Sequence, residues 1–169
     1  MTSIPEMVAL FNGFGGLATF FIAWSEFNSV PENTFQYVLI MLTTYIGGVT
    51  FSGSIVAYGK LSEKLKIQKT SIITKLFTTV FYVSLLFLLY TILITPTFIP
   101  NFEFFTVLLV LTLLGGIGFV IPIGGGDMPV VISLLNSFSG IAAAFAGLLL
   151  LNNVLIVAGS LVGASGLIL

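Results

Sequence analysis

Residues 35–60, FQYVLIMLTTYIGGVTFSGSIVAYGK, decide the fold class, because they hold no charged side chain before Lys60. A helix rises about 1.5 Å per residue, so this run is long enough to cross the hydrocarbon core of a bilayer, which is about 30 Å thick. A membrane strand needs only about 10 residues of alternating polarity, whereas this run is continuous. The sequence therefore predicts a membrane-spanning α-helix at this position.

Further apolar runs of similar character flank this one along the chain. The connections between them are short and contain the proline, glycine and asparagine residues that are typical of turns. We therefore expect residues 1–169 to form one domain, an all-α integral membrane unit of about six transmembrane helices. The expected helices cover residues of about 5–27, 35–60, 71–95, 103–122, 128–151 and 153–169.

The composition excludes several classes of protein. Only 7% of the 169 residues are charged, against about 25% in a typical soluble domain. A soluble globule, a disordered chain and a nucleic-acid binder are therefore excluded. The sequence contains neither histidine nor cysteine, which rules out a Cys/His zinc site, a disulfide framework and a Ser-His-Asp triad.

The distribution of positive charge indicates the orientation in the membrane. All the basic residues lie in or beside the connection between the second and third expected helices: Lys60, Lys64, Lys66, Lys69 and Lys75. The positive-inside rule assigns this connection to the cytoplasmic side, or to the matrix side in a mitochondrion. Both ends of the chain and the connection at 124–127 are then expected on the same inner side. Because the last run stops at Leu169 without a polar tail, we expect the chain to be one piece of a larger protein.

Segments near the two ends of the chain resemble each other and form an internal repeat. Residues 5–18 align with residues 129–142 at a constant offset of 124, and residues 53–57 resemble residues 159–163. The first two expected helices therefore resemble the last two, and both copies point the same way. Transport proteins use such parallel repeats, although a duplication that serves packing alone would leave the same pattern.

Two asparagines occupy matching places in the repeat. Asn12 and Asn136 each lie about 13–14 Å into the membrane, near its midplane. An amide at this depth needs a hydrogen-bond partner inside the bundle. The pair either holds helices together or lines a polar path, and the residues alone leave both readings open.

The second expected helix carries a stripe of small and polar side chains that includes Thr50 and Ser54. Small residues at this spacing let helix backbones approach closely, so this helix is expected in the inner bundle. No acidic or basic residue falls near the midplane. A proton path through this chain would therefore run over amides, hydroxyls and water, or would take its titratable group from a partner chain.

Three motifs in the same order resemble the membrane portion of the beta subunit of the proton-translocating nicotinamide nucleotide transhydrogenase. They are MVALFNGFGG at 7–16, GVTFSGS at 48–54 followed by GKL at 59–61, and GDMPVVISLLNS at 126–137. The resemblance implies a membrane domain that couples proton passage to hydride transfer from NADH to NADP⁺. It also implies a location in the bacterial plasma (inner) membrane or the mitochondrial inner membrane.

The resemblance further implies cofactors and partners. NADP and NAD would belong to the full complex, and none would be bound by this chain. The partners would be the NAD-binding domain and membrane helices of the alpha subunit, an NADP-binding domain of the same subunit and the lipid bilayer. The full complex would be a dimer.

The resemblance also implies roles for particular residues. Asp127 would lie at the interface with the NADP-binding domain. Gln36 aligns near a membrane histidine of many family members, so the titratable group is expected from a partner's helices. We expect no catalytic, metal-binding or cofactor-binding residue in this chain. The expected proton path comprises Asn12, Gln36, Thr50, Ser54, Asn136 and Asn153.

Two other functions fit the composition. The parallel repeat also agrees with a stand-alone transporter of a small solute or ion. A purely structural membrane scaffold would need no polar path at all. A coding sequence for an NADP-binding domain in frame after Leu169 would favour the transhydrogenase.

Overall fold

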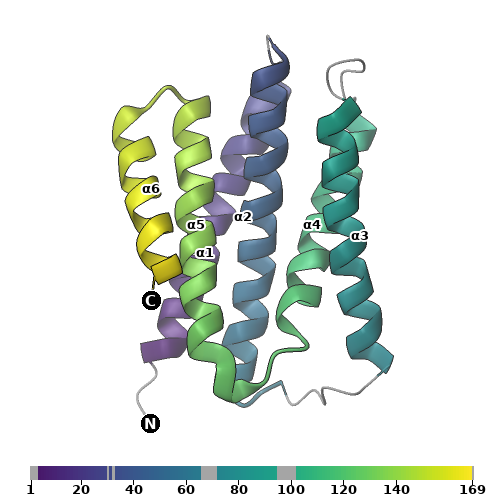
Figure 1. The fold of residues 1–169 in the computed structure, drawn as a ribbon, viewed down its shortest axis with the longest axis vertical. Coiled ribbons are helices and arrows are strands. Elements are labelled where there is room, and N and C mark those ends of the chain that lie inside the picture. The colour runs from purple at the N-terminus through teal and green to yellow at the C-terminus, as the bar shows by residue number, and fades with distance from the viewer. Residues whose placement is uncertain (1–3, 30, 32, 66–71, 95–101, 169) are drawn as a thin grey trace.

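The computed structural model describes residues 4–29, 31, 33–65, 72–94 and 102–168. The described residues form helices joined by short turns, with no strand among them (Figure 1). In chain order the helices are α1 (Ile4–Asn28), α2 (Thr34–Leu61), α3 (Ile72–Ile94), α4 (Phe102–Val120), the 3-10 turn η1 (Gly125–Asp127), α5 (Met128–Leu149) and α6 (Asn153–Ile168).

Length and apolarity make this an integral membrane protein. Five of the described helices are long and apolar enough to cross a bilayer, and α6 is a shorter apolar helix of 16 residues. The all-α membrane fold expected from the sequence is therefore confirmed. Asn33 begins α2 by accepting a hydrogen bond from the backbone N–H of Gln36 at 2.9 Å.

Two helices end before the residues that the apolar runs indicated. The run 103–122 becomes a helix that ends at Val120, because the residue before Pro122 is disfavoured in helical geometry. The run 128–151 becomes a helix that ends at Leu149. Two residues later, Leu151 takes a left-handed φ of 52°, which is a common way for a helix to end. Apolar character thus continues past the end of the hydrogen-bonded helix in both places.

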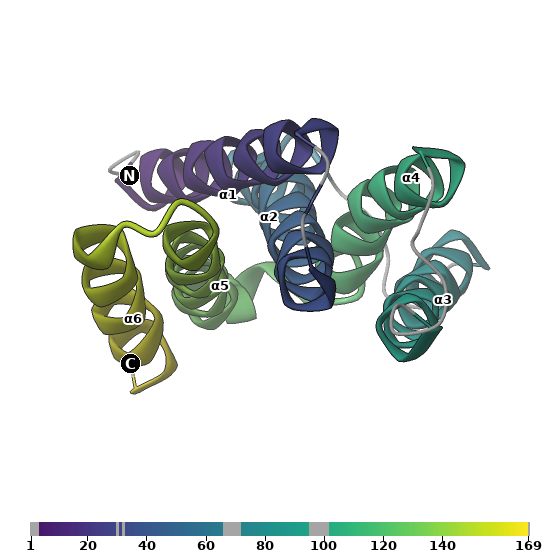
Figure 2. The same ribbon diagram turned by 90° about the horizontal axis from the view of Figure 1, so that it is seen from above.

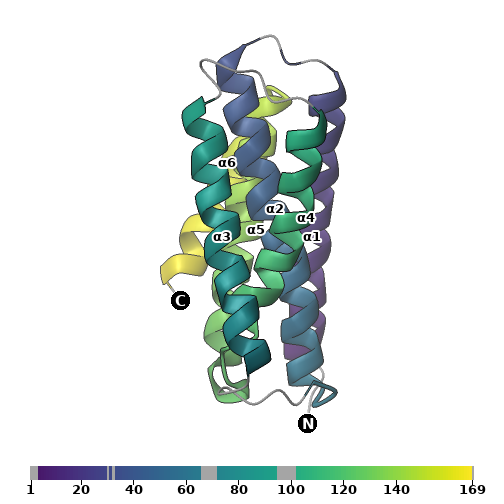
Figure 3. The same ribbon diagram turned by 90° about the vertical axis from the view of Figure 1, so that its right-hand side faces the viewer.

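Helix α2 lies at the centre of the bundle. It packs against α1, α4 and α5, while α6 packs on α5 and α3 packs mainly on α4 (Figure 2). Helix α3 stands at the edge of the bundle, in front of α4 in Figure 3, and exposes large apolar side chains such as Leu76 and Leu86. An apolar outer surface of this kind suits contact with lipid.

Glycines set the distance between the helices of two pairs. A Cβ atom on Gly16 of α1 would lie 2.7 Å from the carbonyl oxygen of Gly47 in α2, and one on Gly47 would lie 2.8 Å from that of Gly16. Gly140 of α5 and Gly159 of α6 make the same reciprocal approach, at 2.9 and 2.7 Å. Side chains larger than hydrogen are therefore excluded from both crossings.

These crossings bear on the predicted repeat. Gly16 and Gly140 correspond in the repeat alignment of 5–18 with 129–142, and each meets a glycine of the next helix along the bundle. Their partners are Gly47 and Gly159, whereas the sequence alignment matches residue 53 with Gly159. The residue of α2 that is equivalent to Gly159 by its contacts therefore lies six residues before the one that is equivalent by sequence. The repeat itself stays a prediction.

We predict that Gly47→Ala lowers the stability of the folded chain. The added methyl group meets backbone atoms that cannot rotate away, so overpacking should cost about 1–3 kcal/mol, near the upper end of that range. The overpacking cost exceeds the roughly 1 kcal/mol of stability that alanine adds relative to glycine inside a helix. The thermal unfolding midpoint in detergent should therefore fall.

Gly126→Ala is the matched control, because a Cβ atom there would meet nothing within 4 Å. Its unfolding midpoint should stay that of the unsubstituted chain. Equal midpoints for both variants would contradict the tight crossing of α1 and α2.

Candidate functional site

Asn12 joins α1 to α5 in the interior. Its side chain is only 7% exposed, and its Nδ2 donates a hydrogen bond to the carbonyl oxygen of Ile132 at 3.2 Å. Ile132 lies one helical turn before Asn136, so this bond brings the two asparagines to neighbouring turns of adjoining helices. Each is eight residues from the start of its helix, which is about 12 Å.

Asn136 is half-buried and lines a hollow in the half of the bundle where α1 and α5 begin. The hollow has a volume of about 450 Å³ and lies between the first turns of α1 and α5; its walls are Val8, Pro129, Val130, Ile132, Ser133 and Asn136. The hydroxyl of Ser133 donates to the carbonyl oxygen of Gly166 at 2.8 Å. Within the described part of the chain, the side-chain amide of Asn136 has no hydrogen bond to protein, so it is open to water or to another chain.

Two hydroxyls of α2 face the same region from the other side. The side chains of Thr50 and Ser54 are fully buried, and they approach α1 at Gly16 and Gly13. The hydroxyl of Thr50 donates to the carbonyl oxygen of Ile46 at 2.6 Å. Gly13 and Gly16 lie one and four residues beyond Asn12, so Ser54 and Thr50 approach α1 within about one helical turn of Asn12.

Ser54 differs from most of the other buried hydroxyls of α2. Its Oγ has no hydrogen-bond partner among the described residues, a property shared only with the hydroxyl of Thr44 there. A buried hydroxyl without a partner costs about 1–3 kcal/mol. Ser54 lines a small hollow of about 280 Å³ between α1 and α2, with Leu10, Gly13, Phe14, Phe51 and Ile55. The hydroxyl is thus available to a water molecule or a passing proton carrier.

Gln36 lies in the first turn of α2, beside the ends of α1 and α5. It lines a hollow of about 320 Å³ whose other walls are Glu26, Ser29, Pro31, Ile40, Leu149 and Leu151. Glu26 has no role predicted from the sequence. Glu26 lies in the last turn of the first apolar helix, before a polar connection, and this position could have marked it as a candidate site residue.

Two expected residues lie apart from this group. Asn153 is exposed at the start of α6, where the neighbouring Asn152 accepts a hydrogen bond from the N–H of Leu155 at 3.1 Å. Asp127 is exposed in η1, directly before α5. Neither residue lines the interior where α1, α2 and α5 meet.

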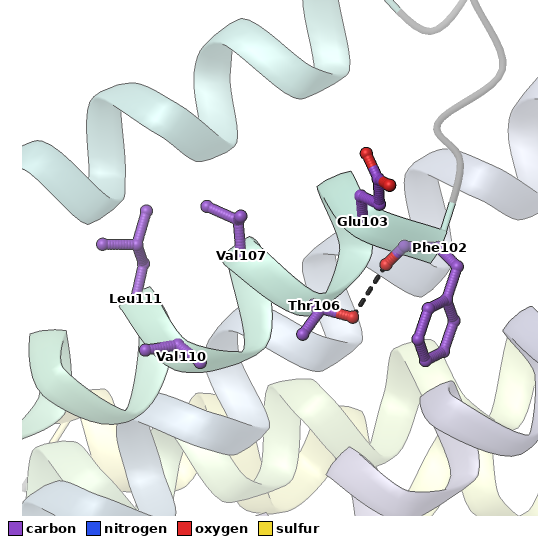
Figure 4. Close-up of a pocket in the computed structure, with 6 residues that line it drawn as sticks. All are labelled: Phe102, Glu103, Thr106, Val107, Val110 and Leu111. Atoms are coloured by element: carbon purple, nitrogen blue, oxygen red, sulfur yellow. Dashed lines mark hydrogen bonds between the residues drawn. The ribbon is translucent and has the colours of Figure 1, made fainter.

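A further hollow of about 520 Å³ lies on the other side of the bundle. All of its lining residues come from α4, as Figure 4 shows: Phe102, Glu103, Thr106, Val107, Val110 and Leu111. The hydroxyl of Thr106 is bonded to the carbonyl oxygen of Phe102 at 2.8 Å. This hollow is mostly apolar and does not connect to the polar group described above. No cluster of metal-binding side chains occurs among the residues that the structure describes.

Comparison with known proteins assigns the chain to a family. The family model of the NAD(P) transhydrogenase beta subunit matches residues 1–169. The chain is 37% identical to NAD(P) transhydrogenase subunit beta of Rhodospirillum rubrum, over an alignment that covers 100% of this chain and 38% of that relative. The sequence from a strain of the same bacterium gives the same identity and coverage. The chain, which spans 38% of the length of these relatives, therefore belongs to the NAD(P) transhydrogenase beta subunit family.

Proposed function

We propose that this chain is the membrane domain of a proton-translocating NAD(P) transhydrogenase. In that role it couples proton passage across the membrane to hydride transfer from NADH to NADP⁺. One observation carries the proposal: a member of this family buries the amide of Asn12 and the hydroxyls of Thr50 and Ser54 where α1 packs on α2 and α5, between hollows near opposite ends of these helices.

The proposed path enters at the outer hollow beside Glu26 and Gln36. It passes the buried side chains of Asn12, Thr50 and Ser54 and leaves through the inner hollow beside Asn136. Amides and hydroxyls both donate and accept hydrogen bonds, so together with water they can pass a proton along. Asn153 remains an expected member that would act near the outer end of α6.

The chain needs a titratable group from elsewhere for this path. It contains no histidine, and the described acidic side chains lie at helix ends or in turns. The open amide of Asn136 supports a partner helix of the alpha subunit as the source, because a half-exposed amide at this depth gains from a polar neighbour.

Hydride transfer would take place outside this chain. NADH and NADP⁺ would bind the NAD-binding domain of the alpha subunit and an NADP-binding domain of the beta subunit, in a complex that would be a dimer. Asp127 is exposed at the inner end and directly precedes the helix that carries Asn136, which supports a contact with the NADP-binding domain. Coupling would be reciprocal, because a proton and a nucleotide that favour the same conformation strengthen each other's binding.

We predict that Asn136→Leu in the assembled complex lowers proton-coupled hydride transfer by roughly tenfold, which corresponds to about 1.4 kcal/mol. Leucine is close in size to asparagine but cannot donate or accept a hydrogen bond. Binding of NADP(H) should survive, since its site lies outside the membrane. The measurements are hydride transfer in energised vesicles and nucleotide binding by titration.

Asn28→Leu is the control for loss of an amide, because Asn28 is exposed and bonds only the carbonyl oxygen of Trp24 in its own helix. The control should keep the full coupled rate. Unchanged coupling in Asn136→Leu would remove Asn136 from the path.

We predict that Ser54→Ala separates stability from function. Removing a buried hydroxyl without a partner should leave the unfolding free energy unchanged or raise it by about 1 kcal/mol. The coupled rate should nevertheless fall, because the path loses a group that can both donate and accept. A variant of equal or higher stability with a full coupled rate would show that Ser54 serves packing alone.

A further inference from the structure

Lys60 reaches from the last turn of α2 to the end of α4. Its Nζ donates to the carbonyl oxygens of Val120 at 3.0 Å, Ile121 at 2.5 Å and Ile123 at 2.6 Å. Three acceptors require three N–H donors, which is the number that a charged ammonium group carries. The half-buried side chain is thus held by backbone atoms from a segment 60 residues or more along the chain.

The end of α4 offers these acceptors for a physical reason. The last carbonyls of a helix have no partner within it and carry the negative end of its dipole. The N–H of Ile123 turns back to the carbonyl oxygen of Val120 at 3.2 Å, and the ammonium of Lys60 bonds the same oxygen from the other side. The carbonyl of Ile123 already lies beyond the helix. Lys60 therefore fixes both the end of α4 and the first residues of the connection to α5.

The rest of that connection has little packing of its own. A Cβ atom on Gly125 or Gly126 would meet nothing within 4 Å. Backbone bonds cross the turn from the N–H of Asp127 to the carbonyl oxygen of Gly124 at 3.1 Å and from the N–H of Met128 to that of Gly125. On the far side the chain is anchored again by Met128, which is fully buried. Lys60 is therefore an anchor on the upstream side of residues 124–127, and Met128 is one on the downstream side.

We propose that Lys60 is a positioning residue that ties the turn at 124–127 to α2. The proposal rests on the function proposed above, because α2 also carries Thr50 and Ser54. A change of hydration or protonation beside these hydroxyls that shifts α2 also shifts the ammonium and, with it, the turn that ends at Asp127. One side chain thus links the membrane interior to the inner surface, where a nucleotide-binding domain would dock.

Lys60→Met in the assembled complex tests the link, since methionine keeps an unbranched chain and removes all three donors. The first readout is the stimulation of hydride transfer when the membrane is energised, with kcat and the KM for NADP⁺ measured separately. The second is the rate at which an impermeant maleimide labels a cysteine introduced by Gly125→Cys. Residues 1–169 contain no other cysteine. Lys64→Met is the matched control, because Lys64 is exposed on the same surface and contacts only the ring of Tyr58, at 5.6 Å.

We expect Lys60→Met to cut the stimulation by energisation about tenfold, within the usual range of coupling between sites. Labelling at Gly125→Cys should rise several-fold, and Lys64→Met should leave both readouts unchanged. An assembled Lys60→Met complex with normal stimulation and normal labelling would overturn the proposal.

If Lys60→Met fails to assemble, Lys60→Gln takes its place, because glutamine retains two N–H donors but no charge. It should show an intermediate loss in both readouts, and normal values in both would again overturn the proposal. The labelling readout also separates the two proposals. A complex whose hydride transfer never responds to energisation would reject the function, while labelling would still report whether Lys60 holds the turn.

Discussion

The interior of this bundle depends on a constraint of the bilayer: a polar group out of reach of water must find its partner inside the protein. The hydrogen bond from Asn12 to the carbonyl oxygen of Ile132 satisfies the amide in this way. It also fixes how α1 is rotated against α5, because only one face of α1 carries the amide. The hydroxyls of Thr50 and Ser54 then lie against α1 on one side of Asn12, and Asn136 lies on α5 one turn beyond the carbonyl that Asn12 bonds.

Glycine makes this arrangement possible. Gly16 and Gly47 let α1 and α2 approach until backbone meets backbone, and the hydroxyl of Thr50, one turn below Gly47, is thereby enclosed. Hollows of about 280 and 450 Å³ remain beside this crossing and beside Asn136.

Apolar run length was enough to predict the class of fold, since it follows directly from the thickness of a membrane. Asn12 could be placed at depth by counting residues from the start of its helix. The missing hydroxyl partner of Ser54 and the three bonds of Lys60 could not be predicted, because they depend on which face of each helix meets its neighbour. Nearly every face of these helices is apolar, so periodicity carries little information on rotation. The helix crossings make Gly47 equivalent to Gly159, whereas the sequence match makes residue 53 equivalent to it, so the repeat stays a prediction.

The central claim is that proton passage through this domain accompanies hydride transfer between nucleotides bound outside it. The most direct measurement follows the pH inside proteoliposomes that hold the complete complex with its nucleotide-binding domains facing the bath. Adding NADH and NADP⁺ should draw protons from the lumen, so the lumen should become more alkaline while NADPH forms, and an uncoupler should abolish the pH change. Formation of NADPH at the full rate with no change of luminal pH would contradict the account.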